Sequence, residues 1–132
     1  MDTIKVVCGI IFNKDKIFIC RRKPEKSLGG FWEFPGGKIE EGENAENCII
    51  REIKEELGVY VKPTTFLKQI KHAYTHFSIT VDAYNCDFLH GCPQPLGCDD
   101  WRWIGPDQIK TLPFPKANHK LFDKILVEEG VC

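Results

Sequence analysis

The sequence predicts a single domain of the α+β or α/β class, built as a sandwich with a mixed β-sheet. Segments rich in β-branched residues alternate with two amphipathic helical segments, in the order strands, helix, strands, helix. The chain has 132 residues and no repeat, linker or low-complexity segment, so we expect residues 1–132 to form one domain. Hydrophobic residues make up 42% and charged residues 28%, which excludes disordered and fibrous classes.

Strands are expected where β-branched and aromatic residues gather. The expected strands are residues 4–12, 17–22, 66–72, 77–87 and 101–104. The segments between them are predicted as a turn at 13–16, a polar loop at 23–30, a short aromatic segment at 31–34, a break at 35–37, a Pro/Gly loop at 91–97 and one helical turn at 106–110.

The clearest helix is expected at residues 44–57. Asn44 suits the N-cap position and Gly58 the C-cap, where a left-handed conformation is common. Apolar residues recur there at helical spacing and form one stripe: Ala45, Ile49, Ile50, Ile53 and Leu57. A second amphipathic helix is expected at 118–129. Its inward-facing residues are expected to be Leu121, Phe122, Ile125 and Leu126.

The charge, hydropathy and cysteine content of the chain exclude some classes of protein. The net charge of −1, from 18 Lys and Arg against 19 Asp and Glu, argues against a domain that binds long nucleic acid through its phosphates. No apolar segment is long enough to span a bilayer, and the N-terminal residues show no signal-peptide pattern. We therefore expect a cytoplasmic protein without a membrane partner, whose seven cysteines are free thiols.

Three cysteines have a spacing that suggests a metal site. Cys86, Cys92 and Cys98 recur every six residues. No C-x-x-C pair accompanies them, and thiolate sites usually contain such pairs. We interpret them as ordinary strand and loop cysteines, with a structural zinc site as the alternative.

Three glutamates gather on the helix at 44–57. Glu52 and Glu56 lie about 40° apart on one face, and Glu55 flanks them. Like charges at this spacing repel each other, and the helix dipole disfavours anions near the C-terminus. A bound hard cation such as Mg²⁺ removes this conflict, because it prefers carboxylate oxygens. The alternative is a solvated charged face, helped by Arg51 and Lys54.

The residues around these glutamates resemble the signature of the Nudix hydrolase family. Gly37 is followed after five residues by Glu43, and after seven more by the run REIKEELGV, from Arg51 to Val59. All seven fixed residues of the signature are present at full spacing. Chance agreement is on the order of 10⁻⁸ per starting position.

The resemblance implies hydrolysis of a nucleoside diphosphate linked to another group, with Mg²⁺ or Mn²⁺, on an α/β/α sandwich around a mixed sheet. The metal ligands that it implies are Glu52, Glu56, Glu55 (directly or through a bound water) and the carbonyl of Gly36. Glu43 and Arg51 would support these ligands, Arg51 by orienting a carboxylate through a charge-assisted hydrogen bond. Which carboxylate takes the proton from the attacking water stays open.

Most of the chain is similar to the MutT-like group of this family, which hydrolyses 8-oxo-dGTP. The similarity is carried by a strand that ends in Arg-Arg at 21–22, the run EFPGGKIE at 33–40 and the segment LPFPKAN at 112–118. It implies that Asn118 reads the oxidised guanine edge, that Phe34 lies against the base and that Arg22 lies near the base or phosphates. The alternatives are an N-cap role for Asn118, a core role for Phe34 and a surface charge for Arg22.

Four further residues are expected to bind substrate. Gly37 and Lys38 belong to the EFPGGKIE run, and glycine lets the backbone approach a ligand closely. Tyr74 and His76 belong to a segment at 71–77 that is similar to the C-terminal domain of MutY, a Nudix-fold reader of 8-oxoguanine in DNA. That domain usually lacks the signature glutamates, which this chain keeps.

One position departs from the pattern of the MutT-like group. Such enzymes often carry a glutamate six residues before the tryptophan of the late strand, which here is Trp103, and the corresponding residue is Gly97. Asp99 and Asp100 lie nearby but do not align. A third carboxylate ligand and the general base are therefore not assigned.

The predicted function is that of a Mg²⁺-dependent nucleoside triphosphate pyrophosphohydrolase that releases nucleoside monophosphate and diphosphate. The expected substrate is 8-oxo-dGTP, in nucleotide-pool sanitisation that avoids mutation. One alternative is a CTP, dCTP or broad-specificity pyrophosphatase of the same family, and another is a stand-alone 8-oxoguanine-binding module. We expect no stable nucleic-acid partner and a monomer or homodimer.

Overall fold

The computed structural model describes residues 2–128 of the chain. Its elements, in chain order, are β1 (Asp2–Asn13), β2 (Lys16–Arg21), β3 (Trp32–Glu33), β4 (Gly36–Lys38), α1 (Ala45–Leu57), β5 (Tyr60–Ala73), β6 (Phe77–His90), β7 (Asp100–Ile104), the 3₁₀ helix η1 (Pro106–Thr111) and α2 (Lys116–Glu128). No helix in this part of the chain has both the length and the apolar character needed to cross a membrane.

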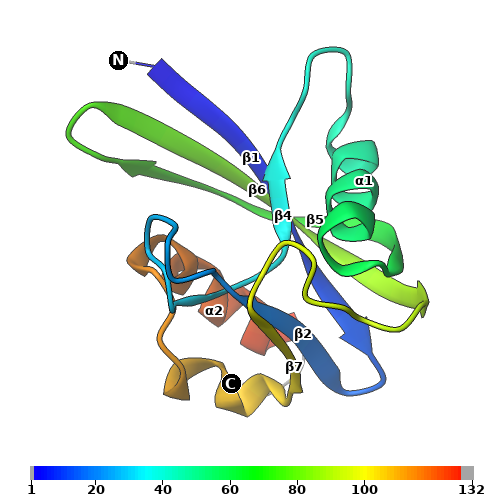
Figure 1. Cartoon of the computed structure of the whole chain (residues 1–132). Coiled ribbons are helices and arrows are strands. Elements are labelled where there is room, and N and C mark those ends of the chain that lie inside the picture. The colour runs from blue at the N-terminus through cyan, green and yellow to red at the C-terminus, as the bar shows by residue number, and fades with distance from the viewer. Residues whose placement is uncertain (1, 129–132) are drawn as a thin grey trace.

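The described strands form one mixed sheet in the order β3-β2-β1-β6-β5, with β4 beside β1 and β7 beside β2 (Figure 1). β1 and β6 run parallel, whereas the other pairs are antiparallel. One edge of β1 pairs first with β4 and then with β2. Between these two partners the backbone N–H of Gly9 donates to the carbonyl of Pro35 at 2.9 Å.

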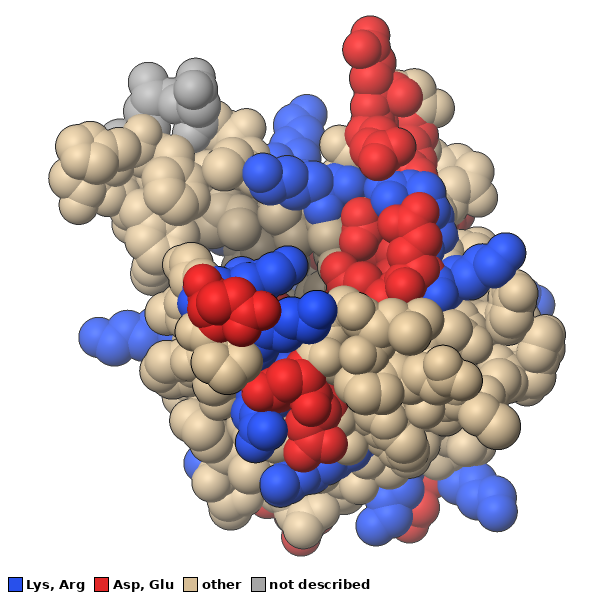
Figure 2. Space-filling view, viewed as in Figure 1, with Lys and Arg blue, Asp and Glu red and all other residues tan. Residues whose placement is uncertain are grey.

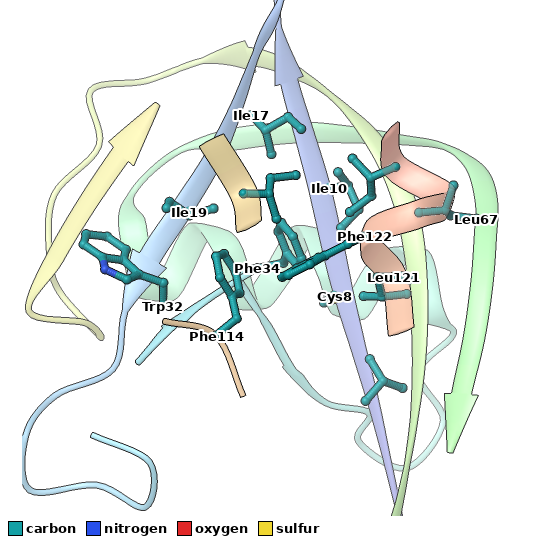
Figure 3. Close-up of a cluster of buried hydrophobic side chains, with 14 of the residues drawn as sticks. Cys8, Ile10, Ile17, Ile19, Trp32, Phe34, Leu67, Phe114, Leu121 and Phe122 are labelled. Carbon is teal, nitrogen blue, oxygen red and sulfur yellow. The ribbon is translucent and has the colours of Figure 1, made fainter. Parts of the chain in front are cut away.

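The helices cover opposite faces of the sheet, which confirms the α/β/α sandwich. Alternate side chains of β1 enter two separate cores, as the period of two in a strand requires. Val7 and Ile11 pack with the buried face of α1, whereas Cys8 and Ile10 pack with α2 and η1. Figure 3 shows the second core, in which Cys8 and Ile10 face Leu121 and Phe122 of α2.

Both ends of α1 have the caps that the sequence predicts. The side chain of Asn44 accepts a hydrogen bond from the Asn47 backbone N–H at 2.8 Å. Gly58 has a φ of 71°, and its N–H donates to the carbonyl of Lys54. The buried residues of α1 are Cys48, Ile49, Ile53 and Leu57. Because this stripe faces the sheet, the glutamates on the adjoining surface stand at the edge of the sandwich.

The break predicted at 35–37 is wrong, because Gly36 and Gly37 belong to β4. They pair with Cys8 and Val7 of β1. A Cβ at Gly36 would overlap the backbone of Val7, so only glycine lets the two chains lie this close.

Two other sets of boundaries also differ. β5 and β6 extend beyond their expected ends, because each continues the ladder of the other through register shifts near Pro63 and Phe66. α2 begins at Lys116 instead of residue 118, and the expected final residue, 129, lies outside the described residues.

Candidate active site

A pocket of about 510 Å³ lies beside β1 and β4. Its walls come from these strands, the loop between β2 and β3, α1, β6 and the start of α2. Figure 2 shows a hollow in the middle of this face, with a group of acidic side chains on one side and Lys and Arg side chains, with acidic ones beside them, on the other. Segments far apart in the sequence therefore meet around one cavity that carries both signs of charge.

The acidic wall is the exposed edge of α1. Glu52 and Glu56 are four residues apart, so they share one helix face, and both line the pocket. Burial, and after it the neighbouring Glu52 carboxylate, raise the pKa of Glu56 to about 8. Glu33, at the end of β3, lines the same pocket, and burial raises the pKa of its carboxyl group.

Arg51 holds the carboxylates around it from behind the pocket. Its Nε donates to Glu43 Oε2 at 2.7 Å and its Nη2 to Glu43 Oε1 at 3.0 Å, a bidentate pair. Its Nη1 donates to Glu52 Oε1 at 3.0 Å and to Glu55 Oε2 at 3.3 Å. The hydrogen bonds from Arg51 lower the pKa of Glu43 to about 2. Arg51 therefore ties the loop before α1 to the glutamates of the helix.

Two glycines leave room for the glutamate side chains. A Cβ at Gly37 would lie 2.6 Å from Glu52 Oε2, and a Cβ at Gly97 would lie 2.8 Å from Glu56 Cγ. Both distances are shorter than a carbon atom tolerates. The glutamate absent at position 97 could therefore not be accommodated without moving Glu56.

The donor set of this wall fits a divalent cation. It consists of the carboxylate oxygens of Glu52 and Glu56, which lie beside the backbone of Gly37 and Gly97 with no Cβ in between. Hard cations such as Mg²⁺ prefer oxygen ligands. Within residues 2–128, no three His, Cys, Asp or Glu side chains already converge as a metal cluster. Arg51 bonds to Oε1 of Glu52 and to Oε2 of Glu55, so Glu52 would meet an ion through its other oxygen, whereas the exposed Glu55 would have to turn.

The opposite end of the pocket is formed by aromatic and amide side chains. Asn118 lies in the first turn of α2, where its backbone N–H donates to the carbonyl of Pro115, so it is not the N-cap residue. Its side chain lines the pocket. Phe34 is only 4% exposed and packs on Phe114 at 5.2 Å between ring centroids, while it also lines the pocket (Figure 3). Tyr74, at the start of the β5–β6 turn, completes this end.

The structure brings together most of the residues singled out from the sequence. Those that line the pocket are Arg22, Phe34, Gly36, Gly37, Lys38, Glu52, Glu56, Tyr74 and Asn118. Arg51 and Glu43 lie behind them, and the side chain of Glu55 is 61% exposed. His76 is exposed in the turn between β5 and β6 and does not line the pocket.

Among the pocket residues that received no role from the sequence are Lys26, Leu28 and Glu33. Glu33 is the first residue of the EFPGGKIE run, so this motif could have indicated that Glu33 lies in the pocket. Lys26 and Leu28 belong to a polar loop without a motif, and only the way in which this loop closes brings them to the pocket.

Asp99, Asp100 and the three spaced cysteines are not among the described residues that line the pocket. Asp99 bonds to Arg21 Nε at 2.8 Å, and Asp100 accepts from the backbone N–H of Trp101. Cys86 and Cys98 are buried beneath α1, whereas Cys92 is exposed, and no group of metal-binding residues forms among the described side chains. Cys86 lies in β6, and Cys92 and Cys98 lie in the segment between β6 and β7.

A family model covers the part of the chain that forms this pocket. The profile of the NUDIX domain matches residues 6–124, which include every residue that lines the pocket except Ile4.

The chain belongs to the Nudix family.

Curated relatives and solved structures of this family are similar to the chain over nearly its full length. An 8-oxo-dGTP diphosphatase of Buchnera aphidicola (subspecies Schizaphis graminum) is 32% identical over 118 residues, 89% of each chain. A CTP pyrophosphohydrolase of Escherichia coli is 27% identical over 96% of this chain and 93% of that one. The solution structure of the E. coli ORF135 protein has a TM-score of 0.85 at 28% identity, over 96% of this chain and 91% of that one.

Membership of the Nudix family defines the class of chemistry. The chain is a Nudix hydrolase, an enzyme that acts on phosphoric anhydrides. Hydrolases of this family generally require divalent metal ions. The acidic edge of α1 is the part of the pocket whose ligands suit such an ion.

Proposed function

We propose that this chain is a Mg²⁺-dependent nucleoside triphosphate pyrophosphohydrolase that converts 8-oxo-dGTP to the monophosphate and diphosphate in the cytoplasmic nucleotide pool. One observation carries the proposal. A single pocket joins the acidic edge of α1 to an aromatic and amide end that includes Asn118. A nucleotide matches both ends. Its phosphate chain needs cations, which the acidic edge would bind, and its base presents hydrogen-bond donors and acceptors to the amide end.

Glu52 and Glu56, with Glu55 and the carbonyl of Gly36, are the residues that would hold Mg²⁺, or Mn²⁺ in its place. A divalent ion bound there supplies charge neutralisation of the phosphate chain and lowers the pKa of a bound water. Arg51 keeps Glu52 beside Gly37 through the hydrogen bond at 3.0 Å. Glu43 in turn fixes the guanidinium plane of Arg51 through two bonds.

The other pocket residues have separate tasks. One carboxylate of the pocket, that of Glu33, Glu52 or Glu56, would accept the proton of the attacking water. Arg22 and Lys38 bring positive charge to the phosphate chain. Water then attacks phosphorus in line with the leaving group, so the pocket walls act mainly by positioning and charge stabilisation.

Base recognition falls to the other end of the pocket. The side-chain amide of Asn118 offers one donor group and one acceptor. No described residue forms a hydrogen bond with this side chain. Phe34 and Tyr74 supply apolar surface for a base, and His76 would join them only if the β5–β6 turn moved toward the pocket. An amide can reject a base that lacks the matching group, because its polar atoms would be left unpaired.

A substrate panel tests the proposal. The protein is incubated with 8-oxo-dGTP, dGTP, dCTP and CTP in the presence of Mg²⁺, and nucleotide products are separated by chromatography. We expect the highest kcat/KM for 8-oxo-dGTP, with monophosphate as the product. Absence of turnover of every triphosphate would reject the proposal. The CTP pyrophosphohydrolase relative favours a second candidate, which a preference for CTP or dCTP would select.

A further inference from the structure

The loop between β2 and β3 is tightly closed and forms one wall of the pocket. Backbone hydrogen bonds join Arg22 to Phe31 and Gly30 to Arg22, both at 3.0 Å, at the base of the loop. Further turns follow inside, where Lys26 N–H donates to Lys23 and Gly29 N–H donates to Lys26. These bonds give the loop backbone a defined path, so the points from which its side chains extend are set by the fold.

Two other features hold the tip of this loop. Arg22 Nε donates to the carbonyl of Ser27 at 2.8 Å, which pins the tip to the strand. A Cβ at Gly29 would lie 2.7 Å from the carbonyl oxygen of Lys23, so the chain is packed against itself there. Lys26 and Leu28, one on each side of Ser27, both line the pocket.

The cationic side chains of the pocket differ in whether they already form ion pairs. Three cationic side chains line it: Arg22, Lys26 and Lys38. The Arg22 guanidinium is already engaged, because it pairs with Glu33 at 3.1 Å and with Ser27. Lys26 forms no ion pair within 4.0 Å in the described part of the chain, yet its charge is close enough to lower the pKa of Glu33 against the effect of burial.

We propose that Lys26 binds the phosphate chain of the nucleotide, from the loop wall beside Glu33, and thereby favours triphosphate over diphosphate substrates. This inference rests on the proposed function. A lysine ammonium is a mobile point charge with three donors, and each phosphate added to the chain adds charge for it to meet. Lys26 lines the pocket from the loop, whereas Lys38 lines it from β4, so the two lysines would hold the phosphate chain from two different elements.

The test compares Lys26→Ala with Lys23→Ala, a lysine of the same loop that does not line the pocket. For Lys26→Ala we expect KM for dGTP to rise about 10-fold or more, with kcat changed much less. The ratio of kcat/KM for dGTP over dGDP should fall in this variant alone, and Lys26→Arg should restore most of it.

A second measurement is independent of turnover. Calorimetry with inorganic pyrophosphate in EDTA should show weaker binding by Lys26→Ala than by wild type and Lys23→Ala. Equal pyrophosphate affinity and equal KM in wild type and Lys26→Ala would overturn the role of Lys26. If wild type hydrolyses no triphosphate but the pyrophosphate affinities still differ, the proposed function fails while the anion site stands.

Discussion

Arg51 and Glu43 form a bidentate ion pair, with Nε to Oε2 at 2.7 Å and Nη2 to Oε1 at 3.0 Å. The pair connects the loop before α1 to the helix face that carries Glu52. Glu43 also accepts a hydrogen bond from the backbone N–H of Glu40, so its carboxylate is held on two sides. Arg51 therefore has a fixed orientation before any substrate binds.

Removing this anchor should impair turnover without unfolding the protein. In Glu43→Gln, Arg51 loses one charged acceptor and its hold on Glu52 weakens, so we expect kcat to fall about 10-fold or more. Steady-state kinetics and thermal unfolding check this, with the exposed Glu41→Gln as the matched control. An unchanged kcat would show that Arg51 keeps its orientation without Glu43.

Glu56→Gln should separate activity from stability. Burial, and after it the neighbouring Glu52 carboxylate, disfavour the charged form of Glu56, and an amide at this position carries no charge at any pH. We expect turnover to fall at least about 100-fold, while Tm stays equal or rises. Glu46→Gln, in the first turn of α1, is the control. A rate near that of wild type would remove Glu56 from the metal site.

Asn118→Ala should erode discrimination between bases. The pocket would lose its amide at the end away from α1, so the ratio of kcat/KM for 8-oxo-dGTP over dGTP should drop about 10-fold or more. Asn47→Ala, on the exposed side of α1, controls for a generic loss of an asparagine. If the ratio is the same in both variants, Asn118 does not read the base.

Gly97→Ala should lower activity through Glu56. The added Cβ would lie 2.8 Å from Glu56 Cγ, so the glutamate must move, and misplacement of about 1 Å can reduce turnover by about 100-fold. Leu96→Ala, an exposed neighbour, should leave kcat unchanged. Full activity of Gly97→Ala would mean that Glu56 can shift without consequence.

Thiol reactivity should follow burial. Cys92 is exposed, whereas Cys86 is fully buried and its pKa is raised to about 12, mainly by burial. Titration of the native protein with Ellman's reagent at pH 8 should therefore lose one rapidly reacting equivalent in Cys92→Ser and none in Cys86→Ser. A loss of rapid reaction in Cys86→Ser would contradict the burial of that strand.

Local patterns predicted the elements that depend on local physics. The hairpin around residues 13–16, both caps of α1 and the inward face of α2 follow from spacing and side-chain chemistry, and all are present. In α1 the buried stripe contains Cys48, whereas the expected Ile50 is only half-buried. β4 was missed, because two glycines favour a break locally but fit beside β1 in the sheet. The true start of α2 was missed because its first turn contacts the preceding Pro115.

The sequence by itself determined the acidic helix and, through its resemblance to the Nudix signature, indicated the class of hydrolase. An i, i+4 pair of glutamates needs no tertiary partner to share one face. Only the tertiary structure decided that Lys26 and Glu33 join that face, and that Tyr74 and Asn118, which the resemblance implied, lie in the same pocket while His76 does not. These contacts depend on how the loop closes and how α2 meets the sheet, and such long-range packing has no local periodicity to reveal it.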